Sequence, residues 1–168
     1  NVAIGVKYAL QRYHLKRVAV IDFDVHHGNG TEDILSGDDR VLMCGIFQHP
    51  FYPYSGTDKP AANMCNVPLA AGSGGEEFRD AVMQVWTPRL KEFKPQMILI
   101  SAGFDGHYED DMGGLKLVEK DYAWCTDHLK KLAAEMCDKR IVAMLEGGYV
   151  MTSLARSVGA HLRSLADL

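Results

Sequence analysis

The chain has 168 residues, of which 47% are apolar and 24% charged, and its formal net charge is −4. This composition is typical of a globular domain and argues against a disordered chain. The negative charge argues against a general nucleic-acid binder, and no apolar run approaches the ~18 residues of a membrane-spanning helix. We therefore expect one domain over residues 1–168, with no direct nucleic-acid partner and no membrane partner.

Apolar runs and helical spacing alternate along the chain. Four apolar, β-branched runs show little alternation, which predicts strands that are covered on both faces. The predicted elements are, in chain order, a helix over 2–10, strands over 18–21 and 41–47, a helix over 78–90, a strand over 97–100, a helix over 122–136, a strand over 141–145 and a helix over 150–165. Strands that alternate with helices predict an α/β fold around a mostly parallel sheet.

The four cysteines, Cys44, Cys65, Cys125 and Cys137, are far apart and form no CxxC pair. In a domain with a sizeable core this spacing favours reduced, buried thiols, and it predicts a cytoplasmic protein. The segment GGEEF at residues 74–78 matches a diguanylate cyclase signature, but it opens an amphipathic run and is better interpreted as the start of a helix. The charged stretch 108–111 is interpreted as a solvated loop.

Polar and glycine-rich sequences follow three of the predicted strands. They are Asp22-Phe23-Asp24-Val25-His26-His27, Ser101-Ala102-Gly103-Phe104-Asp105-Gly106 and Glu146-Gly147-Gly148-Tyr149. The carboxyl ends of parallel strands meet at one edge of a sheet, where α/β proteins bind their ligands. The sequence therefore predicts that these three segments converge on one site.

Two carboxylates and an imidazole in these segments predict a metal site. If the chain stays extended through residue 26, Asp22, Asp24 and His26 point to the same side. Asp24 and His26 could then share one ion with Asp105, which follows the neighbouring strand. Three ligands leave a position open, as in catalytic zinc sites, and Fe²⁺ or Mn²⁺ would suit the same donors. The alternative is an Asp-His turn that caps a helix.

Tyr149 follows two glycines, which let the backbone turn sharply beside a ligand. Its hydroxyl could donate to an oxyanion that forms at the metal site. The alternative is a Gly-Gly turn with a packed tyrosine.

The segments "IDFDVHHGNGTEDIL", "SAGFDGHYEDDMGGL" and "LEGGYVMTSLARSV" together resemble the histone deacetylase family, including its bacterial relatives. The resemblance runs from residue 1 to about residue 160. It implies a three-layer, arginase-like α/β fold and a zinc-dependent amidohydrolase that removes acetyl groups from lysine or polyamines. The substrate stays open among histones, other acetylated proteins, acetylpolyamines and small amides.

The resemblance also implies roles for individual residues. Asp24, His26 and Asp105 match the zinc ligands, Tyr149 matches the tyrosine that stabilises the transition state, and Asp22 matches a carboxylate that orients a catalytic histidine. A looser match places four residues along the substrate tunnel: Tyr52, Met112, Gly147 and Gly148. The backbone around Asp22, Asp24 and His26 resembles a structural potassium site, although Gly45 stands where that site would carry a serine.

The family's general base is a pair of adjacent histidines upstream of the first motif, and this chain opens at Asn1. His26 is assigned to the metal, and His27 should point away from it. We therefore expect a fold that is incomplete at its N-terminal side, with exposed core surface that favours self-association, and little turnover. One alternative is a non-catalytic module that binds metal and acyl-lysine. Another is a binuclear arginase-like hydrolase, for which Gly106-His107 lacks the second-metal pattern.

Overall fold

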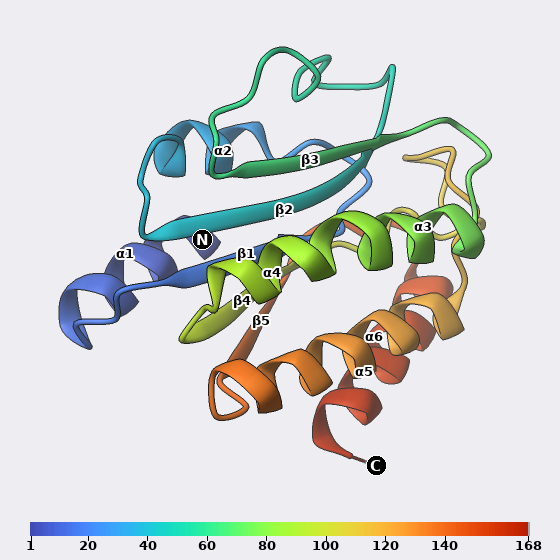
Figure 1. The fold of residues 1–168 in the computed structure, drawn as a ribbon. Helices are drawn as coiled ribbons and strands as arrows, with labels where there is room; N and C mark the ends of the chain where they lie inside the picture. Colours follow the sequence, from blue (N-terminus) through green and yellow to red (C-terminus); the bar gives the residue numbers. More distant parts are fainter. Residues whose placement is uncertain (168) are drawn as a thin grey trace.

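The computed structural model describes residues 1–167, which form a five-stranded parallel sheet with helices on both faces (Figure 1). The sheet order is β3-β2-β1-β4-β5. The elements are α1 (Val2–Arg12), β1 (Val18–Asp22), α2 (Asn29–Leu35), β2 (Val41–Gln48), β3 (Met64–Leu69), α3 (Gly75–Ala81), η1 (Val82–Trp86), α4 (Thr87–Phe93), β4 (Met97–Ala102), α5 (Glu119–Met136), β5 (Ile141–Leu145) and α6 (Met151–Ala166). The predicted α/β class and parallel sheet are confirmed.

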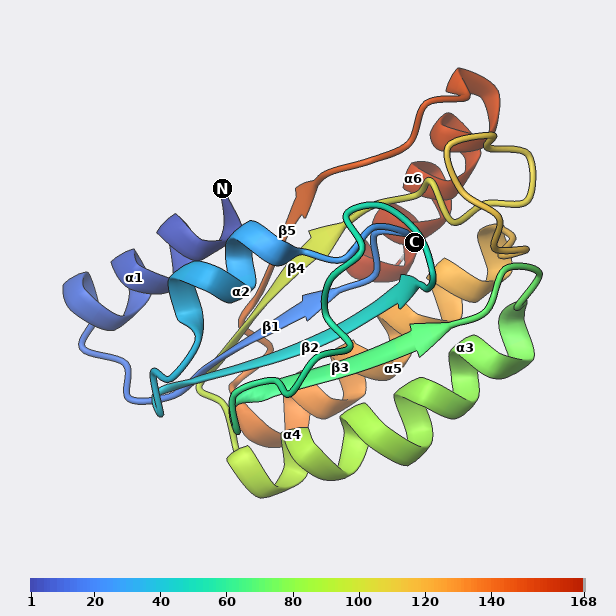
Figure 2. The same ribbon diagram turned by 90° about the horizontal axis from the view of Figure 1, so that it is seen from above.

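Alternate side chains of the central strand serve two hydrophobic cores. Val18 and Val20 pack into the core beneath α1 and α2, whereas Ala19 and Ile21 pack into the larger core beneath α3 to α6. The view in Figure 2 shows the two helical layers on opposite faces of the sheet. Because both faces of β1 are buried, its continuous apolar run is explained by the three-layer arrangement.

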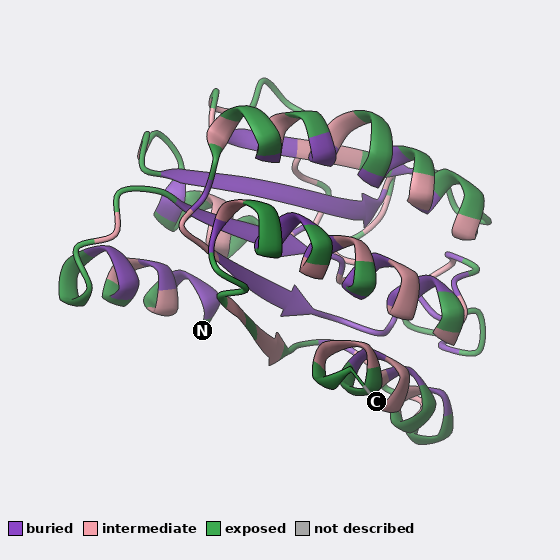
Figure 3. Ribbon diagram, turned by 60° about the horizontal axis from the view of Figure 1, so that its bottom comes forward, coloured by how far each residue is buried: buried purple, intermediate pink, exposed green. Residues whose placement is uncertain are grey.

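Two strands differ from the sequence-based expectation. β3 was not predicted, because Asn66 and Pro68 interrupt its apolar pattern; Pro68 is tolerated because β3 lies at the edge of the sheet. β5 was predicted to be covered on both faces, and this is wrong (Figure 3). It forms the other edge of the sheet, where Val142 is 43% exposed and Leu145 is 58% exposed.

Two local predictions, the helix start at GGEEF and the buried free thiols, are confirmed. The GGEEF segment begins α3, where the Glu77 side chain accepts a hydrogen bond of 2.8 Å from the Gly74 N–H. All four cysteines are free and buried. Within residues 1–167, no helix combines the length and the apolar character that crossing a membrane would take.

Candidate metal site

The sheet topology brings the loops after β1 and β4 side by side. From β1 the chain adds β2 and β3 on one side, whereas β4 and β5 lie on the other. The strand order therefore reverses between β1 and β4, and ligands of open α/β sheets bind at such a point. Asp22, the last residue of β1, pairs with Ser101 in β4, so the two following segments leave the sheet together.

Three predicted ligands converge at this point. The candidate ligand atoms of Asp24, His26 and Asp105 all lie within 4.8 Å of one another. His26 Nδ1 is 3.0 Å from Asp24 Oδ1 and 3.1 Å from Asp105 Oδ2. Asp24 and His26 come from the loop after β1, and Asp105 comes from the loop after β4, so the fold and not local sequence assembles the group.

The local backbone differs from the extended chain that we expected. β1 ends at Asp22, and the chain bends at residues 25–26. Asp22 Oδ1 accepts a hydrogen bond of 3.1 Å from the Asp24 N–H, and Asp24 Oδ1 accepts one of 2.9 Å from the His26 N–H. These turn-like bonds, which aspartate favours, bring Asp24 and His26 together without strand alternation.

Backbone donors hold both carboxylates in place. Asp105 Oδ1 accepts a hydrogen bond of 2.9 Å from the Val25 N–H, and Asp24 Oδ2 accepts one of 2.9 Å from the Gly147 N–H. A Cβ atom at Gly147 would lie 2.0 Å from Asp105 Oδ2, so this position requires glycine. The loop after β5 therefore closes over the carboxylates, and the third predicted segment joins the site.

The electrostatics of the group fit a cation. Burial raises the pKa of Asp105, whereas hydrogen bonds with Asp105 and Asp24 raise the pKa of His26 to about 10. Asp105 Oδ2 is buried, and apart from His26 Nδ1 at 3.1 Å no donor of residues 1–167 approaches it. A buried carboxylate oxygen that no backbone donor satisfies, beside a second carboxylate and an imidazole, is a combination that a divalent ion would satisfy. The residues present therefore fit a metal ion.

Tyr149 lies beside this group. It is 53% exposed, and its pKa is raised, first by partial burial and then by the negative charges of Asp105 and Asp24. Gly148 precedes it with a φ of +138°, and a Cβ there would lie 2.6 Å from Leu154. The two glycines therefore set the turn that presents the tyrosine to solvent next to the carboxylates.

Asp110 holds this turn, although we interpreted the stretch 108–111 as a solvated loop. Asp110 is only 4% exposed. Its Oδ2 accepts hydrogen bonds from the N–H groups of Tyr149 (2.7 Å) and Val150 (3.2 Å), and its Oδ1 accepts one from Met112 (3.0 Å). The interpretation is wrong for this residue, because one carboxylate ties the loop of Asp105 to the start of α6. Nothing in a run of three acidic residues distinguishes Asp110 from its neighbours.

Of the remaining predicted residues, Tyr52 and Met112 are exposed and Asp22 is buried. Tyr52 is 66% exposed, and its ring centroid is 6.1 Å from that of His26; Met112 is 46% exposed. Phe51, which the sequence analysis missed, stacks on His26 at 5.5 Å. Asp22 is buried, and burial is the first cause that raises its pKa well above the usual value.

His27 points away from the three converging side chains. Its Nε2 is 2.8 Å from Glu32 Oε2, and its Nδ1 is 2.8 Å from Ser55 Oγ. Asn66 donates to the same Glu32 oxygen at 2.8 Å and to the Gly56 carbonyl at 3.0 Å. This hydrogen-bond network joins α2 and β3 to the loop that carries Phe51 and Tyr52. Both ring nitrogens of His27 therefore already have partners within the fold.

Comparison with known proteins agrees with this geometry. A family model described as the histone deacetylase domain matches residues 1–165. The chain therefore belongs to the histone deacetylase family, as its three motifs indicated.

Relatives and solved structures support the same assignment. The chain is 44% identical over 183 residues to type-2 histone deacetylase 2 of Dictyostelium discoideum, a match that covers 99% of this chain and 11% of that protein. It is 34% identical to a histone deacetylase-like amidohydrolase of Pseudomonas aeruginosa, with 89% of this chain and 41% of that protein covered. The structure of the histone deacetylase Clr3 superposes with a TM-score of 0.89 at 30% identity, over 99% of this chain and 30% of that one.

Proposed function

We propose that this chain carries the metal site and the oxyanion-binding tyrosine of a zinc-dependent deacetylase. The substrate would be an acetylated lysine in a protein or peptide, or an acetylated amine such as an acetylpolyamine. The observation that supports the proposal most is the convergence of Asp24, His26 and Asp105 within 4.8 Å, in a chain of the histone deacetylase family. An amide-hydrolysing relative, the amidohydrolase of Pseudomonas aeruginosa, belongs to the same set of matches.

Asp24, His26 and Asp105 would hold the ion. Zinc suits two carboxylates and one imidazole, and Fe²⁺ is the alternative that the same donors accept. A bound ion of this kind supplies a Lewis acid and lowers the pKa of a water ligand towards ~7. The potassium ion near Asp22 stays a prediction.

Other side chains would bind and orient the substrate. The Tyr149 hydroxyl would donate a hydrogen bond to the oxyanion that develops on the acetyl carbonyl. Tyr52 and Met112, together with Phe51, would flank the acyl-lysine chain, and Gly147 and Gly148 would let it approach the backbone. Asp22 would orient a histidine of the family's general base, which is neither His26 nor His27.

Neither histidine of the first motif is well placed to act as a general base. His26 lies between the two carboxylates, and His27 is committed to Glu32 and Ser55. We therefore propose that this chain alone binds metal and acyl-lysine analogues but turns over slowly. The same observation favours the second candidate, a non-catalytic module that binds metal and acyl-lysine.

One experiment tests the proposal and separates the two candidates. The zinc-loaded chain is titrated with an acetyl-lysine peptide and with a lysine-derived hydroxamate, and acetate release is followed with and without added imidazole as an external base. Zinc-dependent binding of both ligands supports the proposal. Acetate release that imidazole stimulates favours the deacetylase, and binding without any release favours the module. Equal binding by the zinc-free chain would contradict both.

A further inference from the structure

Two cysteines face each other across neighbouring strands and take no part in the chemistry described above. Cys44 in β2 and Cys65 in β3 are direct partners in the parallel register. We propose that Cys44 and Cys65 form a redox-active pair, which a peroxide oxidises to a disulfide and a dithiol reductant restores.

The register places the two side chains within reach. Paired residues of parallel strands share a face of the sheet, and both cysteines belong to the core beneath α3 to α6. Adjacent strands are separated by ~4.8 Å, which falls inside the Cα separation that disulfides span. The bond would therefore join two strands that are already hydrogen-bonded, with little movement of the backbone.

The four thiols of the chain differ in their ease of ionisation. Burial raises the pKa of Cys125 to about 12, and burial also raises the pKa of Cys137. Cys44 is fully buried, and burial raises its pKa well above the usual value. Cys65 is the exception, because a hydrogen bond from the Cys44 thiol and the positive charge of Arg89 lower its pKa in spite of burial. Cys65 would therefore be the attacking thiolate and Cys44 its resolving partner.

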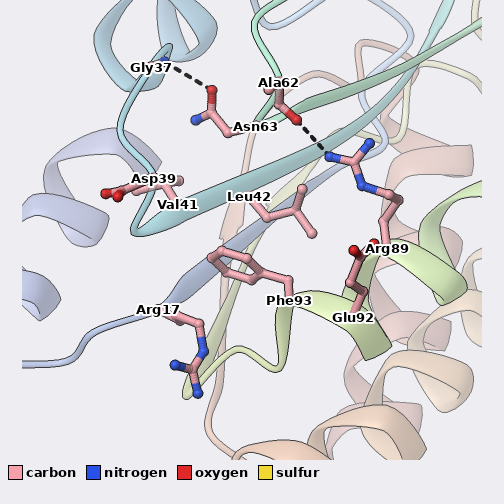
Figure 4. Close-up of a pocket in the computed structure, with 10 residues that line it drawn as sticks. All are labelled: Arg17, Gly37, Asp39, Val41, Leu42, Ala62, Asn63, Arg89, Glu92 and Phe93. Carbon is pink, nitrogen blue, oxygen red and sulfur yellow. Dashed lines mark hydrogen bonds between the residues drawn. The ribbon is translucent and has the colours of Figure 1, made fainter.

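Arg89 also lies close enough to Cys65 for its charge to act on the thiol. It projects from α4, and its Nη2 donates a hydrogen bond of 2.7 Å to the Ala62 carbonyl, just before β3. Arg89, Ala62 and Asn63 line an open hollow of about 740 Å³, which Figure 4 shows at the amino ends of the strands. Cys65, two residues beyond Asn63 in an edge strand, is 5% exposed. A small oxidant would need a local opening of this edge of the sheet to reach the Cys65 sulfur.

The oxidation balances with hydrogen peroxide as the oxidant. The Cys65 thiolate attacks one peroxide oxygen, an S–O bond forms, the O–O bond breaks, and the hydroxide that leaves takes up a proton to become water. The Cys44 sulfur then attacks the Cys65 sulfur; an S–S bond forms, the S–O bond breaks, and the thiol proton of Cys44 leaves with the hydroxide as a second water. Two thiols lose two electrons in total, and one peroxide gains them.

The test is peroxide treatment of the folded chain, followed by intact mass and non-reducing peptide mapping. We expect the loss of two hydrogens, a single Cys44–Cys65 cross-link, and full reversal by dithiothreitol. Cross-links that involve Cys125 or Cys137, or four thiols that remain free under conditions that oxidise an unfolded control, would overturn the proposal.

Single-residue variants distinguish the attacking sulfur from the resolving sulfur. In Cys44→Ser, peroxide should leave Cys65 as a sulfenic acid that dimedone traps, whereas Cys65→Ser should remain unreactive at Cys44. Cys125→Ser is the matched control and should form the cross-link like the parent. Arg89→Gln should slow alkylation of Cys65 by iodoacetamide several-fold. Dimedone labelling of Cys44 in the Cys65→Ser variant, at the rate seen for Cys65, would contradict the assigned order of attack.

Discussion

The two ends of one parallel sheet carry very different polar groups. At the amino end, the hollow of about 740 Å³ has arginines that donate to nearby backbone carbonyls. Arg17 Nε donates to the Lys94 carbonyl at 2.9 Å. Arg89 donates to the Ala62 carbonyl at 2.7 Å (Figure 4). At the carboxyl end, Asp105 is completely buried, and His26 Nδ1, at 3.1 Å, is the one donor among residues 1–167 that approaches its Oδ2.

The difference shows that the open hollow and the buried, converging charges lie at opposite ends of the sheet. The arginines at the amino end are solvated and already paired, so an ion or ligand would gain little from them. The carboxyl end concentrates buried charge that remains unsatisfied, and a cation would relieve it. A variant at one end can therefore be compared with a variant at the other end or at an exposed neighbouring residue.

The largest effect should come from removing one predicted ligand. Asp105→Asn should weaken zinc binding by more than about 100-fold, which exceeds the usual effect of losing a residue that only hydrogen-bonds to a metal ligand. Isothermal titration calorimetry with zinc measures this. The control Glu92→Gln changes an exposed carboxylate at the hollow and should bind zinc like the parent. Equal affinities for the parent and Asp105→Asn would remove the basis for the carboxyl-end site.

Tyr149→Phe removes the proposed oxyanion donor and keeps the ring. A hydroxamate should bind the zinc-loaded variant about 10- to 100-fold more weakly, because a hydrogen bond to a charged group is lost. Zinc affinity itself should not change. Tyr54→Phe is the control, since Tyr54 is 75% exposed on the neighbouring loop. A hydroxamate affinity that survives in Tyr149→Phe would remove the tyrosine from the site.

His161 gives a pH dependence beneath the carboxyl-end loops. It is 3% exposed beside Phe23 and Phe104, and burial lowers its pKa to about 4. Because the folded state holds the neutral ring, this stabilisation is present above the unfolded pKa of ~6.5 and is lost as the pH falls towards 4. Replacing His161 by Phe should remove roughly 2 kcal/mol of the acid-induced decrease in unfolding free energy.

Urea denaturation of the parent and His161→Phe between pH 7 and pH 4 measures that difference. His14→Gln, which changes an exposed histidine, is the control and should follow the parent. Parallel stability curves for all three proteins would show that His161 does not titrate in this window.

Asp110→Ala tests the link between the Asp105 loop and α6. The change leaves the N–H groups of Tyr149, Val150 and Met112 without their acceptor, and the unfolding free energy should fall by about 1–2 kcal/mol. The exposed neighbour Asp111 provides the control, and Asp111→Ala should lower the unfolding free energy far less. If both variants were equally stable in urea, the buried hydrogen bonds of Asp110 would have no net effect.

The smallest effect is expected at the amino end. Arg17 is exposed and donates one hydrogen bond to a backbone carbonyl. Arg17→Ala should change the unfolding free energy by less than about 1 kcal/mol and leave zinc affinity untouched. A loss of zinc binding in this variant would contradict the assignment of the metal site to the carboxyl end of the sheet alone.

The sequence predicted the parts of this molecule that depend on simple periodicity. Continuous apolar runs located β1, β2, β4 and β5, and the polar segments that follow three of them do converge. β3 was not predicted, because Asn66 and Pro68, which an edge strand tolerates, interrupt its apolar pattern. The exposure of β5 was not predicted either, because the pattern of a strand does not reveal which strands lie at the edges of the sheet.

Within the site, residue type predicted more than residue environment. Aspartate and histidine after a strand suggested ligands, and Asp24 and His26 do approach Asp105, although the backbone bends where we expected it to stay extended. Asp110 and Phe51 were missed because their importance lies in contacts with distant segments: one accepts from the start of α6, and the other stacks on His26. Only the folded chain supplies those partners.

The central claim is that Asp24, His26 and Asp105 share one divalent ion. Anomalous diffraction at the zinc edge from crystals of the zinc-loaded chain tests it directly. We predict one zinc per chain at this point, with bonds of about 2.0–2.2 Å to both carboxylates and to the His26 ring. A zinc ion bound elsewhere, or no anomalous peak within bonding distance of these three side chains, would contradict the account.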